Sequence, residues 1–220
     1  LIGGSAVEMP WIDKVPCVLQ AWYGGMEGGS AIADIVFGDV NPSGKLPITF
    51  PKRLEDVPAH AIGIGQYNDQ DCEYRESLLV GYRYYDTKRV EPLFPFGHGL
   101  SYTKFAYTNL TVDAKTLEAR VDVKNVGQRA GKEVVQLYVR DMDSTVARPF
   151  KELKGFEKVD LAPGETKRVV FRLNERSLAF YNADSKRWVA EPGEFEILVG
   201  SSSRDLRVKA RLSYKVTEGG

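Results

Sequence analysis

The pattern of apolar and polar positions changes near residue 100. From about residue 103, apolar and polar residues alternate with a period of two, which is typical of strands with one buried face. The predicted inward faces are Ala119, Val121 and Val123; Val135, Leu137 and Val139; Val169, Phe171 and Leu173; Phe195, Ile197 and Val199; and Leu206, Val208, Ala210 and Leu212. Since no helical period intervenes, we expect residues 103–220 to form an all-β, antiparallel sandwich.

Turn residues and cysteine positions indicate which type of β-sandwich to expect. The predicted strands are bounded by Asn125-Val126-Gly127, Pro163-Gly164 and Pro192-Gly193, which are typical turn sequences. Both cysteines, Cys17 and Cys72, precede this region, so the Cys…Trp…Cys pattern of antibody domains is absent from it. The sequence therefore predicts a fibronectin type III-like sandwich.

Residues 1–102 instead mix strand-like and helix-like segments. Residues 15–22 form a short apolar run, as in a strand that is buried on both faces of a parallel sheet. After a glycine-rich turn, helical spacing relates Ala31, Ile32, Ile35 and Val36, and Gly38 follows as a helix terminator. Strand, turn and helix in this order predict an α/β fragment, an incomplete parallel α/β/α sandwich. A second strand-like run covers residues 77–85.

The composition excludes several classes of partner. Thirty basic residues balance thirty acidic ones, so the chain has no electrostatic footprint for nucleic acid or an anionic membrane. No apolar run approaches the ~20 residues that span a bilayer, so we expect a soluble protein, either cytoplasmic or exported. Two cysteines make neither a disulfide framework nor a zinc site. We expect Cys17, in its apolar run, to be buried, and we expect no cofactor and no metal.

The chain begins with Leu1 instead of methionine, and no signal-peptide pattern is present. We therefore expect it to be part of a longer protein. Neither its oligomeric state nor its compartment follows from the sequence.

Several ordered motifs resemble glycoside hydrolase family 3. The segment Gly4–Trp11 resembles the family's Gly-Ser-Pro-Val-Glu-Met/Leu-Pro-Trp sequence. The other matching segments, in the family's order, are residues 21–29, 37–47, 80–86, 94–102 and 149–158. The chain departs from the family's preferred residues at Gly24, Met26, Ser77 and His98. The resemblance covers nearly the whole chain and implies the C-terminal part of a family 3 β-glucosidase.

The resemblance also implies a mechanism and a place for this chain in it. Such enzymes retain anomeric configuration with two carboxylates about 5–5.5 Å apart. The nucleophilic aspartate and the acid/base glutamate are both expected upstream of Leu1, so no catalytic residue is expected here. The chain would support the active-site cleft, and the β-glucoside or oligosaccharide would be bound through the upstream domains. A β-xylosidase, another exo-β-glycosidase, or a module that binds polysaccharide or protein remain alternatives.

Glu27 and His98 are candidate catalytic residues, but each also has a structural interpretation. Glu27 precedes the predicted helix, where a carboxylate stabilises the helix dipole by ~0.3–1 kcal/mol; we favour this role over that of the catalytic acid. His98 lies between two glycines. Since the family accepts tyrosine there, we favour packing or hydrogen bonding over general-base work.

Three further groups have a structural and a functional interpretation. Asp69, Asp71 and Glu73 have the spacing of a partial calcium loop, but a solvated acidic loop is favoured. A tyrosine-rich cluster is either half-buried sheet or the rim of a sugar cleft, and its members are Tyr74, Glu76, Tyr82, Tyr84 and Tyr85. Within it, Glu76, Tyr84 and Tyr85 are the candidate substrate-binding residues. We expect core or inter-domain packing for Trp11, Trp22 and Trp188.

An exposed row of aromatic residues would distinguish a binding module from a scaffold. The sandwich sequence contains isolated Tyr107, Tyr138, Tyr181 and Tyr214 but no clear row, which favours the scaffold. We further expect residues 103–216 to fold alone, whereas residues 1–60 would expose apolar strand edges.

Overall fold

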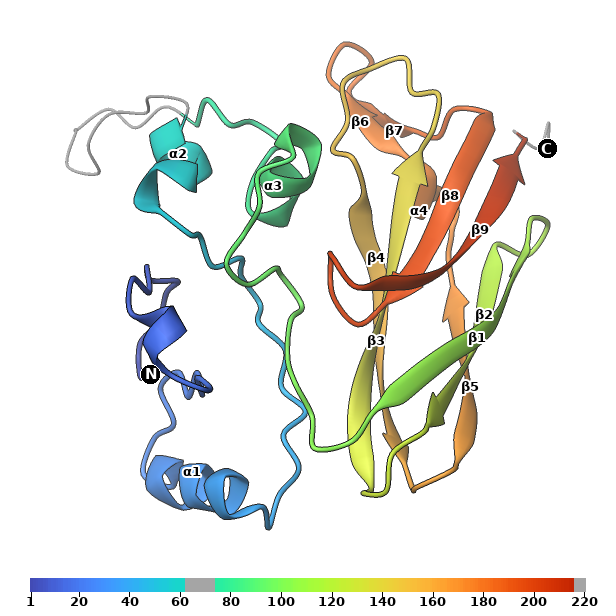
Figure 1. Cartoon of the computed structure of the whole chain (residues 1–220). Coiled ribbons are helices and arrows are strands. Elements are labelled where there is room, and N and C mark those ends of the chain that lie inside the picture. The colour runs from blue at the N-terminus through green and yellow to red at the C-terminus, as the bar shows by residue number, and fades with distance from the viewer. Residues whose placement is uncertain (62–73, 216–220) are drawn as a thin grey trace.

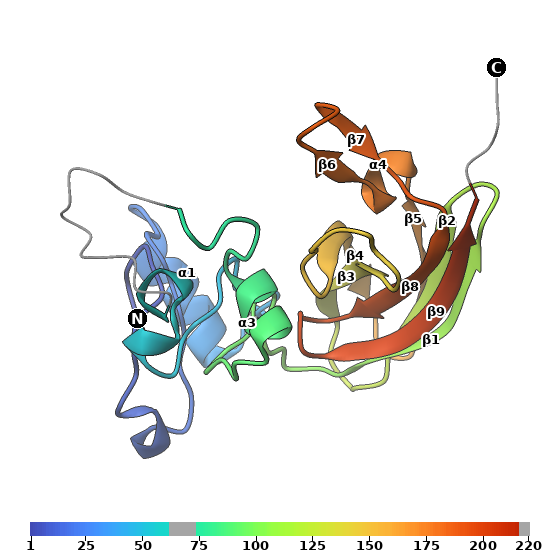
Figure 2. The same ribbon diagram turned by 90° about the horizontal axis from the view of Figure 1, so that it is seen from above.

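The computed structural model describes residues 1–61 and 74–215. Figure 1 shows two parts lying next to each other, one with most of the helices and one built of strands. Helix α3 lies on the side of the first part that faces the strands, and Figure 2 shows the same arrangement from above.

The strands form an antiparallel sandwich of two sheets. One sheet has the order β1-β2-β5, from Phe105–Asp113, Glu118–Asn125 and Thr166–Arg172. The other has the order β4-β3-β8-β9, from Glu152–Leu161, Gly131–Asp141, Gly193–Gly200 and Leu206–Tyr214. A separate hairpin pairs β6 (Phe180–Asn182) with β7 (Arg187–Val189). The short helix α4 (Glu175–Leu178) precedes this hairpin.

The alternating residues form the core between the two sheets, which confirms the predicted sandwich. Members of all the predicted inward faces belong to it, and Val121, Val135, Leu137, Ile197 and Val199 have no exposed surface. The face on β9 is less complete: Leu212 is buried, whereas Val208 is only partly buried. The turn after Asn125 and the turn at Gly164 each carry the chain from one sheet to the other.

The first part contains helix α1 (Gly28–Phe37), the short helix α2 (Pro58–Ala61) and helix α3 (Tyr82–Lys88). The predicted helix after the glycine turn is confirmed as α1. It ends at Gly38, whose φ of 83° is a left-handed conformation that glycine adopts at little cost. Short 3-10 turns cover Ile12–Lys14 and Leu54–Asp56.

Two strand predictions in this part were wrong. Residues 15–22 form no assigned strand, and the run ends at Trp22, whose φ of 52° is left-handed. Leu1 makes two backbone hydrogen bonds to this run. Its amino group donates to the Leu19 carbonyl (2.7 Å), and its carbonyl accepts from the Ala21 amide (2.8 Å). Cys17 is exposed, against expectation. The run 77–85 is a turn followed by α3, which begins after Gly81, where φ is 53°.

Helix α3 forms despite its β-prone tyrosines because of the face that it buries. Tyr85 and Asp86 are buried on it, and Tyr82, one turn earlier, packs on the sandwich. Tertiary packing of this kind overrides weak local preferences. The division into residues 1–102 and 103–220 stays a prediction; the first strand of the sandwich begins at Phe105. The longest helix of the described residues, α1, has 10 residues, about half of what a bilayer requires.

Candidate functional site

The most buried charges of the molecule join α3 to the sandwich. The Asp86 carboxylate and the Lys151 ammonium, each with a side chain 2% exposed, form an ion pair and a hydrogen bond. Arg204, in the turn between β8 and β9, pairs with the same carboxylate at 2.6 Å. Arg204 also donates to the carbonyls of Tyr85 (3.1 Å) and Val90 (2.9 Å). Asp86 therefore connects α3 to two separate loops of the sandwich.

Tyr82 provides a second, aromatic connection. Its ring stacks on Phe96 with centroids 4.9 Å apart and meets Tyr138 edge-on at 5.8 Å. Its hydroxyl accepts a hydrogen bond from the Leu153 amide at 2.8 Å. Burial raises the pKa of the Tyr82 phenol. A half-buried phenol whose hydroxyl is hydrogen-bonded and whose pKa is raised is a structural contact and does not release its proton near neutral pH.

A third connection lies at the other end of the junction. The Lys45 ammonium pairs with Glu133 on β3 at 3.3 Å and donates to the Gly99 carbonyl at 3.2 Å. The Tyr107 hydroxyl donates to Glu133 at 2.7 Å. Burial, followed by the charge of Glu133, raises the pKa of Tyr107 far above its usual range. The two parts are thus joined by buried polar groups that have partners on both sides.

The three candidate substrate-binding residues occupy different environments. Tyr84 (8% exposed) and Tyr85 (3% exposed) lie in α3, with ring centroids 5.8 Å apart. Burial raises the pKa of Tyr85 to about 12. Glu76 is half-buried, and its Oε2 atom has no hydrogen-bond partner among the described residues. The structure therefore does not bring the three together around one cavity, and their role in substrate binding stays a prediction.

Glu27 and His98 lie where their structural interpretations place them. Glu27 is exposed at the N-cap of α1, although its side chain makes no capping hydrogen bond. The His98 ring stacks on Phe94 with centroids 5.3 Å apart. Burial, followed by the charge of Lys45, lowers the pKa of His98. Asp69, Asp71 and Glu73 lie outside the described residues. Among residues 1–61 and 74–215, no group of three or more His, Cys, Asp or Glu is arranged to hold a metal ion.

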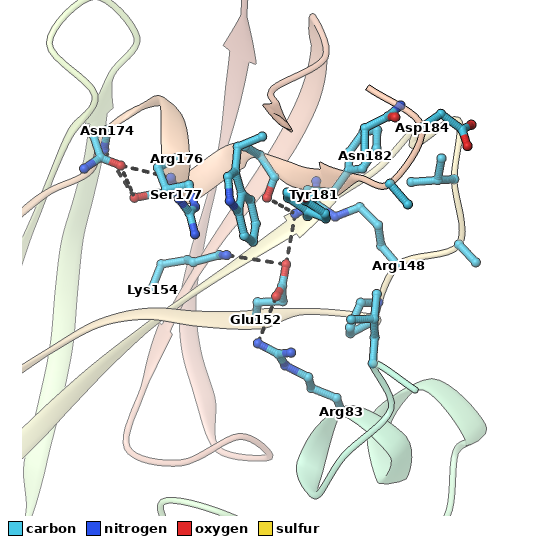
Figure 3. Close-up of a pocket in the computed structure, with 18 residues that line it drawn as sticks. Arg83, Arg148, Glu152, Lys154, Asn174, Arg176, Ser177, Tyr181, Asn182 and Asp184 are labelled. Atoms are coloured by element: carbon cyan, nitrogen blue, oxygen red, sulfur yellow. Dashed lines mark hydrogen bonds and ion pairs between the residues drawn. The ribbon is translucent and has the colours of Figure 1, made fainter. Parts of the chain in front are cut away.

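A pocket of about 710 Å³ opens at the end of the sandwich near α3 (Figure 3). The lining residues come from three places: α3 and the turn before it, the loop and strand at 146–154, and the segment from α4 through the β6–β7 hairpin. Its volume lies within the range of roughly 300–1,000 Å³ usual for small-molecule sites. The pocket therefore spans the junction between the two parts of the chain.

Glu152 is the charged centre of this pocket. Its carboxylate pairs with Arg83 of α3 at 3.0 Å, with Arg148 at 2.9 Å and with Lys154 at 3.5 Å (Figure 3). Burial opposes ionisation of Glu152, but Lys154, Arg148 and Arg83 outweigh it, so that its pKa is lowered. A general acid needs the opposite shift, because it must hold its proton near neutral pH. Glu152 is consequently better suited to accept bonds from these cations than to act as a general acid.

The sequence interpretation missed the aromatic pair at the pocket. Trp188 is 46% exposed, so of the two predicted packing roles the one in the core was wrong for it. The inter-domain alternative stays a prediction, and Trp188 lines the pocket at the junction of the two parts. It lies opposite Tyr181 across the β6–β7 hairpin, with ring centroids 5.5 Å apart. The signal was their spacing around the Asp184-Ser185 turn, which makes them cross-strand partners in a two-stranded hairpin. Trp11 and Trp22 are half-buried, and Trp22 meets Phe50 edge-on at 6.5 Å.

Comparisons with known proteins agree with both parts of the fold. Residues 1–102 match the model of the glycosyl hydrolase family 3 C-terminal domain, and residues 133–203 match that of a fibronectin type III-like domain. The chain belongs to glycoside hydrolase family 3. It is the C-terminal part of such a protein, and the predicted α/β segment and β-sandwich are the two domains that this part contains.

Similar proteins within family 3 are named β-glucosidases. The chain is 58% identical to thermostable β-glucosidase B of Acetivibrio thermocellus, covering 99% of this chain and 29% of the relative. It is 47% identical to β-glucosidase BoGH3A of Bacteroides ovatus, over 97% of this chain and 30% of the relative. A crystal structure of a Kluyveromyces marxianus β-glucosidase in complex with glucose is 42% identical, with a TM-score of 0.91 over 97% of this chain and 26% of that chain. The chain thus spans less than a third of these family 3 proteins.

Proposed function

We propose that this chain supports the active site of a retaining β-glucosidase, which removes terminal β-D-glucosyl residues from the non-reducing ends of its substrates. The observation that carries the proposal is the similarity to proteins named β-glucosidases over nearly the entire chain, at 58% and 47% identity. In this proposal the nucleophilic aspartate and the acid/base glutamate lie upstream of Leu1. The substrate is a β-glucoside or an oligosaccharide that ends in one.

The carboxylates described above support a scaffold role. The carboxyl groups of Asp86 and Glu152 are each held by two or more cations. Neither is free to attack a substrate or to carry a catalytic proton, because several charge-assisted contacts hold each carboxylate in a fixed position. Their geometry instead holds α3 against the sandwich. A rigid support of this kind positions the catalytic groups that neighbouring segments carry.

Hydrolysis of p-nitrophenyl β-glucoside tests the proposal. The chain alone is compared with a longer protein that also carries the upstream family 3 domains. We expect activity in the longer protein and none in the chain alone. Activity in the chain alone would overturn the proposal, and substitution of Glu27 and Glu76 would then show which carboxylate is responsible.

A further inference from the structure

The β6–β7 hairpin presents two large aromatic side chains to solvent. Tyr181 is 51% exposed and Trp188 is 46% exposed. Each strand of the hairpin has only three residues, and the hairpin belongs to neither sheet of the sandwich. An isolated short hairpin gains little stability from exposing its largest side chains. A ligand that covers these rings would account for their position at the edge of the pocket.

Arg176 of α4 lies on the Trp188 ring, with its guanidinium carbon 3.3 Å from the ring centroid. No carboxylate pairs with Arg176 among the residues that the structure describes. Its planar group and the indole therefore form a stacked unit beside the Tyr181 ring. Such a unit combines flat apolar surfaces with N–H donors at their edges.

The floor of the pocket is polar but compensated in charge. Arg83, Arg148 and Lys154 all pair with Glu152, and Arg148 also pairs with Asp141 at 2.9 Å. The Arg148 side chain is only 8% exposed, and it donates to the Leu178 carbonyl of α4 at 2.8 Å. The floor is therefore rigid, and it presents both donors and acceptors without a large free charge. Figure 3 shows Glu152, Lys154 and Arg83 below the hairpin, Arg148 beside Tyr181, and Asn182 and Asp184 farther along the hairpin.

A ligand suited to this pocket has flat apolar faces and a rim of hydroxyl groups. A pyranose ring has both, because its axial C–H bonds pack on aromatic rings while its hydroxyls bond to planar polar side chains. The compensated floor favours a neutral ligand over an anionic one, because Arg83, Arg148 and Lys154 all pair with Glu152. Arg176 lies at the hairpin instead, stacked on Trp188. The volume of about 710 Å³ accommodates more than one sugar ring.

We propose that the pocket between the β6–β7 hairpin and the start of β4 binds a neutral oligosaccharide segment, with one sugar ring packed against Trp188 and Tyr181. In this proposal the site is non-catalytic, because the central carboxylate, Glu152, is engaged by three cations. It rests on the proposed function, which supplies glycan substrates, and adds a second place where the protein holds such a chain.

Isothermal titration of the 220-residue chain with cellopentaose tests this site. We expect saturable binding, a Kd raised roughly tenfold by Trp188→Ala, and near-normal binding by Trp188→Phe, which keeps an aromatic face. Phe156→Ala is the matched control: Phe156 is 67% exposed but lies outside the pocket, so its removal leaves the Kd unchanged. Thermal unfolding of each variant verifies that the fold is retained.

Three results would overturn the site: no saturable binding of cellopentaose, equal binding by Trp188→Ala, or binding of trigalacturonate alone, which would indicate an anion site. Hydrolysis of p-nitrophenyl β-glucoside by the longer protein separates this proposal from the preceding one. Hydrolysis without cellopentaose binding by the chain overturns the pocket only. Cellopentaose binding without hydrolysis by the longer protein overturns the proposed function only.

Discussion

Asp122 and Arg168 face each other across strands β2 and β5 and form a two-point ion pair. The Arg168 Nε and Nη2 atoms lie 2.7 and 3.0 Å from the two carboxylate oxygens, and Asn109 donates a third bond at 3.0 Å. The bonds from Arg168 and then Asn109 lower the pKa of Asp122 to about 2. Hydrogen bonds of this kind favour the ionised carboxylate and so link stability to pH.

We predict that Asp122→Asn reduces the acid sensitivity of the fold. A carboxyl group with a lowered folded-state pKa contributes stability above its ordinary pKa, and this contribution is lost as pH falls towards 2. Because Arg168 is 61% exposed and solvent screens the pair, we expect the contribution to be on the order of 1 kcal/mol. Urea unfolding at several pH values between about 5 and 2 measures it.

The control for the pH series of urea unfolding is Asp160→Asn. Asp160 is exposed on β4, in the other sheet, and its carboxylate has no ion-pair partner within the described part of the chain. Its substitution should leave the pH dependence of unfolding unchanged. Identical pH profiles for Asp122→Asn and the unmodified chain would show that the ion pair does not contribute.

At the scale of elements, the contact between α3 and the sandwich depends on one buried carboxylate. Asp86→Ala leaves the Lys151 ammonium, 2% exposed, without a counter-ion. Removing one partner of a buried pair costs about 3–5 kcal/mol, because the remaining charge stays desolvated. We expect a loss in the unfolding free energy near the lower end of that range, measured by urea denaturation, since Arg204 can still turn towards Glu91.

The double variant Asp86→Ala with Lys151→Met separates charge from packing. Methionine removes the unpaired ammonium and fills similar space, so the double variant should be more stable than Asp86→Ala alone. If both variants were equally unstable, the loss would come from packing around α3 and not from the buried charge.

The core of the sandwich provides a second prediction at this scale. Ile197 on β8 has no exposed surface and lies between the two sheets. Ile197→Ala should lower the unfolding free energy by about 3 kcal/mol, because it leaves a cavity in the closed core. Phe156→Ala, on the exposed face of β4, should change it by less than about 0.5 kcal/mol. Chemical denaturation of both variants makes the comparison, and equal losses would contradict the assigned faces.

Sequence patterns predicted these elements unequally, for physical reasons. Strand β5 was predictable because its core residues Val169 and Phe171 alternate with exposed residues. Strands β3 and β8 keep an apolar core face with the same period, marked by Val135 and Ile197, although parts of their other face are also buried. The strand predicted at residues 15–22 makes its long-range backbone hydrogen bonds in the described structure to Leu1, whereas a strand requires a ladder of such bonds with a neighbouring strand. Helix α3 was missed because Tyr84 and Tyr85 favour strands locally, whereas the buried Asp86 network favours a helix.

The site was harder to predict than the fold. The pocket joins Arg83 to Glu152 and Arg148 with the β6–β7 hairpin, and nothing in the local sequence shows that these segments meet. The tyrosine-rich segment attracted attention through its residue types, yet Tyr84 and Tyr85 are buried. Exposure of Trp188 likewise depends on the hairpin projecting from the sandwich, which is a property of the whole fold.

At the scale of the whole molecule, apolar surface is distributed unevenly between the two parts. In residues 1–61, several large apolar side chains are mostly exposed: Ile2 73%, Tyr23 78%, Met26 101% and Phe37 82%. Helix α1 has no buried residue. The sandwich instead has a continuous core of buried residues on both sheets. Since burial of apolar surface is the main source of stability, the two parts should differ in their resistance to opening.

We predict that chymotrypsin cleaves within residues 1–61 of the isolated chain well before it cleaves the sandwich. Local opening is cheap where few apolar contacts must be broken, and Tyr23 and Phe37 are exposed cleavage sites. In a longer protein that carries the upstream domains, the same bonds should become resistant, because covering the exposed face of α1 removes both access and the ease of opening. Mass spectrometry of timed digests identifies the first cuts. Equal resistance of both parts in the isolated chain would show that residues 1–61 are stable without any covering partner, and the exposed apolar face would then need another explanation.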